Sequence, residues 1–268
     1  MLKAKQHGAV TDFKTGRHFG KLVLYYVHSF LVGNTLIDTS TTYVGNELVS
    51  VLENTNIKTI INTHHHEDHT GNNLLLQEKF GAEIYAHPFA IPLMKQVPIK
   101  KQRLYLRVLW NYPEPTEAIP LGNQIQIDSH LFRIIHTPGH SPDHICLYEP
   151  DEQWLFTGDI YCGERVKYLR KDENFNLLLE SLKKLSQLEV KTIFCAVSGV
   201  VADGGTALQR KIEFMDSLSE KVWSQYREGK SPSQIRSTLL GKEGAMYWAS
   251  AGHFSKQNVV NSILGLAP

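Results

Sequence analysis

The chain has 268 residues, of which 28 are basic and 27 acidic, and 42% are hydrophobic. This composition excludes a disordered chain, collagen and a coiled coil, and the net charge of +1 gives no electrostatic footprint for nucleic acid or an anionic membrane. The length fits one large domain with an appendage, or two small domains. Histidine is the unusual residue: four of the 13 lie between positions 64 and 69.

Targeting signals and disulfides are not expected. No apolar run is long enough for a transmembrane helix, and the first 20 residues lack the apolar core of a secretory signal. The three cysteines, Cys146, Cys162 and Cys195, are scattered and form no CxxC pair. They are predicted to be buried free thiols, which favours a reducing compartment, the cytoplasm.

Strand and helix patterns alternate along the first 205 residues. Strands are predicted over 21–27, 29–37 (with a turn at Gly33-Asn34), 57–62, 82–86, 124–127, 131–135, 145–148, 154–156 and 191–196. Helices are predicted over 48–53 (44–54 at most), 73–80 and 174–188. This order is typical of a layered α/β fold.

A long segment without a regular pattern covers residues 88–120. It contains six prolines and the aromatic residues Tyr105, Trp110 and Tyr112. Two interpretations stay open: a substrate-binding loop or lid, or a loop that packs on the domain surface.

The last 60 or so residues have a helical pattern throughout. Helices are predicted over 208–228, 232–240 and 255–264. Ser231 and Gln234 form a capping-box pattern around Pro232, and Ser255 is a candidate N-cap. We therefore expect two parts, residues 1–205 and residues 206–268.

The segment from Thr63 to Asn72, THHHEDHTGN, carries the strongest chemical signal. It follows a predicted buried strand and precedes a helix, which is where α/β sheets place their sites. His64 and His66 are two residues apart and share one face of an extended chain, and Asp68 keeps that register. Imidazole and carboxylate groups are ligands that Zn²⁺ prefers. A solvated loop or a tag-like run explains this embedded cluster poorly.

Two later segments, also at strand ends, offer further ligands. The first is HTPGHSPDH, residues 136–144, where proline and glycine fix a tight turn around His140. The second is TGD, residues 157–159, which ends at Asp159. Either segment is weak evidence taken alone.

The three motifs, H-x-H-x-D-H, H-T-P-G-H-S and T-G-D, together resemble the metallo-β-lactamase fold superfamily over residues 21 to about 205. The resemblance implies an αββα sandwich with metals at one edge of the two sheets, followed by a helical C-terminal extension like that of the beta-lactamase-like hydrolase and endoribonuclease branch. It also implies a first metal on His64, His66 and His140. Asp68 and His69 would hold a second metal, and Asp159 would bridge the two.

One position departs from the family pattern. Family members usually place a last histidine after the final core strand, and here Val197 stands at that position. A shift of one residue would place Ser198 there, and neither residue is a normal zinc ligand. The second site is expected to be weakened. The alternatives are that His253 substitutes as a ligand, or that Val197 is an engineered or decayed position.

The favoured function is a zinc-dependent hydrolase that uses a metal-activated water on a small-molecule ester, lactone or thioester. Asp68 is the predicted catalytic residue, because it would orient that water and move its proton. The expected cofactor is one or two zinc ions, with iron or manganese as alternatives. Thr63, Thr137 and Asp143 are candidates for holding the histidine ligands.

Three other functions stay open. A phosphodiesterase or endoribonuclease is compatible with the C-terminal extension, but acidic residues offset its basic ones, so nucleic acid is not a favoured partner. A mononuclear iron enzyme of the persulfide dioxygenase type would use His64, His140 and Asp159 as a facial triad. A non-enzymatic binding protein is disfavoured by the six retained ligands. Substrate identity and oligomeric state do not follow from the sequence.

Overall fold

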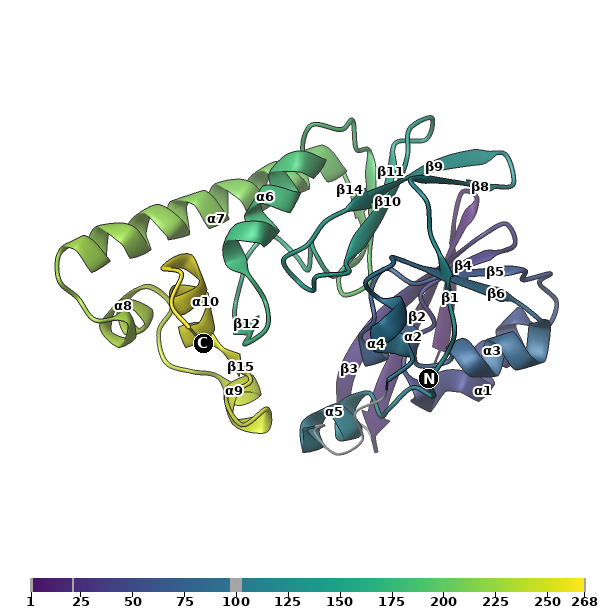
Figure 1. The fold of residues 1–268 in the computed structure, drawn as a ribbon, viewed down its shortest axis with the longest axis horizontal. Coiled ribbons are helices and arrows are strands. Elements are labelled where there is room, and N and C mark those ends of the chain that lie inside the picture. The colour runs from purple at the N-terminus through teal and green to yellow at the C-terminus, as the bar shows by residue number, and fades with distance from the viewer. Residues whose placement is uncertain (1, 21, 97–102, 268) are drawn as a thin grey trace.

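Two β-sheets stacked face to face form the centre of the molecule, and helices cover both outer faces (Figure 1). The computed structural model describes residues 2–20, 22–96 and 103–267. The first sheet has the order β1-β2-β3-β4-β5-β6-β7 and the second has the order β14-β13-β11-β10-β9-β8. The predicted αββα sandwich with a helical C-terminal region is confirmed.

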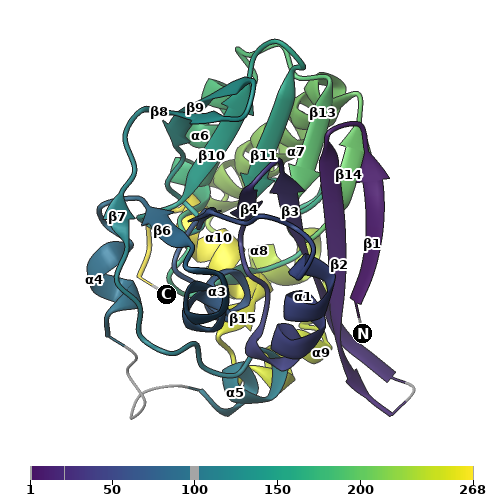
Figure 2. The same cartoon turned by 90° about the vertical axis from the view of Figure 1, so that its right-hand side faces the viewer.

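The strands of the first sheet are β1 (Leu2–His7), β2 (Val10–Phe19), β3 (Leu22–Val32), β4 (Thr35–Ile37), β5 (Thr59–Ile61), β6 (Glu83–Ala86) and β7 (Ile119–Pro120). Those of the second sheet are β8 (Gln124–Ile127), β9 (His130–His136), β10 (Ile145–Glu149), β11 (Trp154–Gly158), β13 (Thr192–Cys195) and β14 (Gly199–Ala202). A small third sheet pairs β12 (Leu169–Arg170) with β15 (Phe254–Ser255). Figure 2 shows β1 and β2 at one edge of the first sheet.

The helices are a 3-10 turn (Thr42–Val44), α1 (Gly45–Leu52), α2 (Glu67–Thr70), α3 (Asn73–Phe80), α4 (Ile91–Met94), α5 (Leu104–Leu109), α6 (Phe175–Leu185), α7 (Gly204–Arg227), α8 (Pro232–Leu239), α9 (Ala245–Ala249) and α10 (Lys256–Ile263). Ser231 forms the predicted capping box with Gln234, and Ser255 caps α10 by accepting a hydrogen bond from Gln257 N. Among the described residues, none of the helices combines the length and apolar character that a membrane crossing requires.

The core follows the period-two alternation of side chains along each strand. On β3, Phe30 and Val32 face the second sheet, whereas Leu31 faces outward. On β10, Ile145 and Leu147 face the first sheet, whereas Cys146 packs under the helices. Each central strand is therefore apolar on both faces, which is why the sequence shows continuous apolar runs there.

The two outer faces carry separate apolar clusters. Leu48 of α1 and Leu76 of α3 cover the first sheet, and Leu182 of α6 belongs to the cluster over the second. That second cluster also includes Met215 of α7 and Val260 of α10. The C-terminal helices thus share a core with the second sheet (Figure 1). The division at residues 205 and 206 stays a prediction.

The structure differs from the predicted elements in several places, and β1, β2, β14 and α9 are not among those predicted. Residues 22–32 form one long strand, β3, because its partner β2 extends alongside it through the whole region that the sequence divides into two runs. The 88–120 segment contains α4, α5 and β7. Residue 21 at the start of the first predicted strand, and residues 97–102 with Pro98, lie outside the described residues.

Gly139 stands at the point where the turn before His140 touches α6. Its φ is +133°, and a Cβ there would overlap the backbone of Leu178. Gly139 O also accepts a hydrogen bond of 2.7 Å from Asn174 N, the residue before α6. The absence of a side chain therefore lets the turn and the helix meet.

We expect Gly139→Ala to lower the free energy of unfolding by about 3 kcal/mol, because strain at this φ adds to overpacking against α6. The control is Gly81→Ala, with φ +68° and no atom within 4 Å of the new Cβ, which should lose only about 1 kcal/mol. Chemical denaturation measures both values. Equal losses would contradict the close-packing argument.

Candidate metal centre

The predicted site residues follow four strands at one edge of the sandwich. His64 and His66 come after β5, and α2 carries Asp68 and His69. His140 follows β9, Asp159 follows β11 and Val197 follows β13. Strands β9, β11 and β13 run in the same direction, so their carboxyl ends lie at the same edge of the second sheet.

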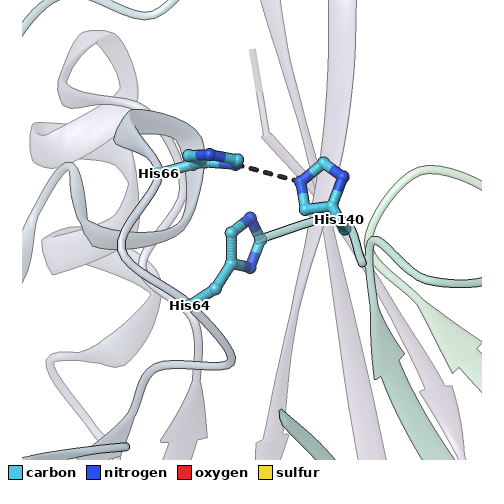
Figure 3. A group of neighbouring side chains, drawn as sticks. All are labelled: His64, His66 and His140. Carbon is cyan, nitrogen blue, oxygen red and sulfur yellow. Dashed lines mark hydrogen bonds between the residues drawn. The ribbon is translucent and has the colours of Figure 1, made fainter. Parts of the chain in front are cut away.

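The first group of possible metal ligands contains His64, His66 and His140, all buried (Figure 3). One ligand atom from each lies within 4.8 Å of the others. His66 Nδ1 and His140 Nε2 face each other at 2.9 Å. His140 Nδ1 donates to Glu173 Oε1 at 2.6 Å, which leaves Nε2 directed at the group. The structure therefore brings together the three histidines that the resemblance assigns to a first metal.

The second group contains His64, His69 and Asp159, again with ligand atoms within 4.8 Å. His69 Nε2 lies 3.4 Å from Asp159 Oδ1, and His140 Nε2 lies 3.5 Å from Asp159 Oδ2. Asp159 therefore lies between the two groups. Asp68 belongs to neither group in this structure, although its Oδ1 lies 3.8 Å from His69 Nε2.

Unpaired atoms at the centre of the cluster fit a bound cation. His64 Nε2, His69 Nε2 and Asp159 Oδ1 are buried and have no hydrogen-bond partner. Leaving such atoms unpaired in a protein interior is costly, and a metal ion satisfies imidazole nitrogen and carboxylate oxygen together. The donor set is nitrogen and oxygen only, which suits zinc and also iron or manganese.

Burial and nearby carboxylates set the charge of the imidazoles. Burial lowers the pKa of His64 and His66 well below its ordinary value, so both rings are neutral, as metal ligation requires. For His69, burial acts against the charged form, but Asp38 and Asp159 outweigh it and raise the pKa. The carboxylates around His69 therefore favour a positive charge at this position.

Asp38 orients the ring of His69. It is not one of the site residues predicted from the sequence. Asp38 Oδ2 accepts from His69 Nδ1 at 2.7 Å and from Thr63 Oγ1 at 2.8 Å, and Oδ1 accepts from Thr63 N at 2.8 Å. This arrangement orients His69 Nε2 toward Asp159. Its only sequence signal is a polar residue directly after a buried strand. Glu173, which holds His140, had no such signal.

Of the three candidates for holding the histidine ligands, only Thr63 contacts one of them, whereas Thr137 and Asp143 contact other histidines. Thr63 Oγ1 lies 3.0 Å from His64 Nδ1. Thr137 Oγ1 lies 2.9 Å from His144 Nδ1, and His144 Nε2 accepts from Asp159 N at 3.1 Å. Burial lowers the pKa of His144 to about 3, so the neutral ring supports the Asp159 backbone.

Asp143 binds a histidine outside both groups. Its Oδ1 lies 2.8 Å from His65 Nδ1 and its Oδ2 accepts from His65 N at 2.8 Å. The Asp143 carboxyl has its pKa lowered to about 2, since hydrogen bonds and the charge of His65 outweigh the opposing effect of burial. Asp143 thus shapes the loop between His64 and His66.

Tyr25 of β3 is a further residue at the site. Its hydroxyl donates to Asp68 Oδ2 at 2.6 Å, and its ring meets Trp110 edge-on with centroids 5.4 Å apart. Burial raises the Tyr25 pKa well above its ordinary value, so the hydroxyl stays a donor. Trp110 comes from the aromatic 88–120 segment, which therefore both packs on the domain and reaches the site.

Val197 lines the same pocket as Asp68 and Asp159, with 38% of the residue exposed. His253 lies elsewhere: its Nδ1 is 2.5 Å from Tyr105 Oη and its Nε2 is 3.4 Å from Asp172 Oδ1. Both ring nitrogens of His253 are thus engaged, and it belongs to neither group found among the described residues. In this structure His253 joins the C-terminal region to α5 and does not replace the missing histidine.

A pocket of about 230 Å³ opens beside the two groups. Its walls come from the metal-site loops, from residues 160–170 and from the C-terminal region. The residues that contact it include Tyr25, His66, His140, Trp110, Arg170, Lys211, Met246 and Phe254. A small molecule in this pocket would lie against the candidate ligands.

Comparison with known proteins agrees with this geometry. The profile described as "Metallo-beta-lactamase superfamily" matches residues 22–197, and the chain belongs to this superfamily. A "Beta-lactamase domain protein" from Burkholderia ambifaria has the same fold, with a TM-score of 0.71 at 17% identity over 97% of this chain and 88% of that one.

Two curated relatives have names that state an activity. A hydroxyacylglutathione hydrolase from Pelagibacter ubique is 32% identical over 157 residues, 55% of each chain. An atrochrysone carboxyl ACP thioesterase from Pseudocercospora fijiensis is 28% identical over 200 residues, 70% of this chain and 52% of that one. The chain therefore spans about half the length of these relatives.

Asp38 and Asp143 offer a matched test of how the ligands are held. Each accepts from one histidine ring and one backbone N–H, but only Asp38 holds a ring of the two groups. We expect Asp38→Asn to weaken metal affinity by about 10- to 100-fold. Asp143→Asn should weaken it much less. Metal titration of chelator-treated protein measures both, and equal effects would contradict the assigned role of Asp38.

Proposed function

We propose that the protein is a metal-dependent hydrolase of small-molecule thioesters, with esters and lactones as related substrates. The observation that carries this proposal is the buried group of His64, His66 and His140 at the wall of an open pocket. The two named relatives support a thioester, because one is a thioesterase and hydroxyacylglutathione is itself a thioester.

In this proposal His64, His66 and His140 hold a first ion. Asp68 and His69 hold a second ion, and Asp159 lies between the two. Zinc is the proposed metal. A bound zinc ion would lower the pKa of a coordinated water from 15.7 to about 7 and polarise the substrate carbonyl.

Asp68 is the proposed proton acceptor. Tyr25 occupies its Oδ2, so Oδ1 is the oxygen left for the proton of an attacking water. Glu173 and Asp38 hold the two imidazoles on either side, His140 and His69, so that little rearrangement is needed during the reaction. The apolar rings of Trp110 and Phe254 border the pocket and limit access of bulk water.

The test is a panel of matched thioester, ester, lactone, β-lactam and phosphodiester substrates. We expect the thioester to have the highest kcat/KM, and Asp68→Asn to lower it by about 10²- to 10⁴-fold. The control Asp151→Asn, at an exposed turn, should be unchanged. A phosphodiester as the best substrate would contradict the proposal, as would oxygen consumption on a persulfide by an iron-loaded protein.

A second prediction concerns Val197. We expect the purified protein to hold about one tight zinc ion per chain, because the second group lacks the histidine usual at this position. Val197→His should raise the zinc content toward a second ion and raise kcat. The matched control is Val51→His, which is also 38% exposed but lies on α1. Two tight ions in the unmodified protein, or no change in Val197→His, would contradict the assignment.

Two further statements belong to the same proposal. The chain divides into residues 1–205, which carry the metal ligands, and residues 206–268, which complete the pocket through Lys211, Met246 and Phe254. The protein works in a reducing compartment such as the cytoplasm. Its three cysteines are free thiols, and two of them are buried, which supports this location.

A further inference from the structure

The pocket has basic side chains that, among the described residues, form no ion pair with a carboxylate of the pocket. Its acidic residues are Asp68, Asp159 and Glu173, and each is already engaged with the metal-site residues. Its basic residues are Arg165, Lys167, Arg170 and Lys211. Arg165 and Lys167 are exposed, whereas Arg170 and Lys211 are buried.

Lys211 is the more informative of the two. It lies on the buried face of α7 and is only 3% exposed. Its Nζ donates to Gly163 O at 3.0 Å, and within the described ranges no Asp or Glu forms an ion pair with it. An ammonium group has three donors, and lysine is almost never fully buried unless it is paired.

Among the described residues no carboxylate lies within ion-pair distance of Lys211, and its Nζ is 5.9 Å from the centroid of the Tyr161 ring. The titratable groups that act on it are the thiols of Cys162 and Cys195 and, at longer range than an ion pair, the carboxylate of Glu173. Burial lowers the Lys211 pKa, which indicates an ammonium that lacks a sufficient counter-charge. Since Lys211 also lines the pocket, an anion in the pocket can provide that charge.

Arg170 adds to the same preference. Its Nε and Nη2 pair with Asp172 at 3.1 and 3.2 Å, and the described residues give Nη1 no hydrogen-bond partner. Arg170 thus lines the pocket with one guanidinium nitrogen that has no partner among the described residues. A cation bound at the histidine groups would make the pocket still more positive.

We propose that the pocket selects substrates with a negatively charged group, and that the buried ammonium of Lys211 is the counter-ion of that group. The inference depends on the proposed function only for the type of bond that the protein cleaves, which is the thioester. Lys211 is a specificity residue, because it binds a part of the substrate away from the reacting carbonyl.

The experiment compares the S-acetyl thioester of 3-mercaptopropionate with that of its methyl ester, on the metal-loaded protein. The carboxylate substrate should have the higher kcat/KM by about tenfold or more, mainly through KM. Lys211→Met should abolish this preference, mainly by raising KM for the carboxylate substrate. The control Lys221→Met, on the exposed face of the same helix, should keep the preference.

Binding is measured in parallel with the uncleavable thioether 3-(ethylthio)propionate and its methyl ester, by calorimetry or protein-detected NMR. A preference for the carboxylate that is lost in Lys211→Met, in a protein that cleaves neither thioester, supports the inference while refuting the proposed function. Cleavage of both thioesters without a preference refutes the inference alone. A preference that persists in both Lys211→Met and Lys211→Gln means that the carboxylate binds elsewhere, and also refutes it.

Discussion

Three of the four imidazoles of the candidate site, His64, His69 and His140, have one nitrogen held by a neighbour, and this constraint organises the site. Asp38 holds His69, Glu173 holds His140 and Thr63 holds His64. A histidine ring has only two polar atoms, so fixing one nitrogen sets the direction of the other. The remaining nitrogens of His64 and His69 are buried and have no hydrogen-bond partner, and that of His140 faces His66 Nδ1. A cation bound at this point would satisfy these unpaired atoms, whose burial is otherwise energetically unfavourable.

The partners come from segments far apart in the chain, which ties the site to the whole sandwich. Asp38 follows β4, whereas His69 lies on α2, after β5. Strands β4 and β5 are parallel neighbours, so their carboxyl ends bring the two residues together. The His140 turn is pressed against α6, and Glu173 lies just before that helix. Small shifts between sheet and helix would therefore move a ligand.

The C-terminal helices contribute to the pocket and not only to stability. They share an apolar cluster with α6 and the second sheet, and α7 directs Lys211 into the cavity. The contact between Tyr105 and His253 joins them to α5, next to Trp110. The candidate metal ligands and part of the pocket wall thus come from different parts of the chain.

Much of the fold was readable from local patterns. The alternation of apolar residues predicted the central strands, and the capping box at Ser231 predicted the start of α8, because both depend on neighbours in sequence. Part of the candidate site could also be predicted, because several of its residues are close together in the sequence. His64, His66, Asp68 and His69 lie within six residues, and the motifs around His140 and Asp159 resemble a known family.

By itself, the sequence determined a layered α/β class, since this follows from short-range periodicity. The αββα sandwich and the candidate ligands followed from the resemblance of the three motifs to a known family. Only the tertiary structure decided which groups support them. Asp38, Glu173 and Tyr25 have no distinctive local pattern, and they act on residues 31, 33 and 43 positions away. Only the structure showed that His253 is engaged elsewhere and that Lys211 is buried without an acidic partner. Burial and pairing are properties of the packed molecule, because residues distant in sequence create them.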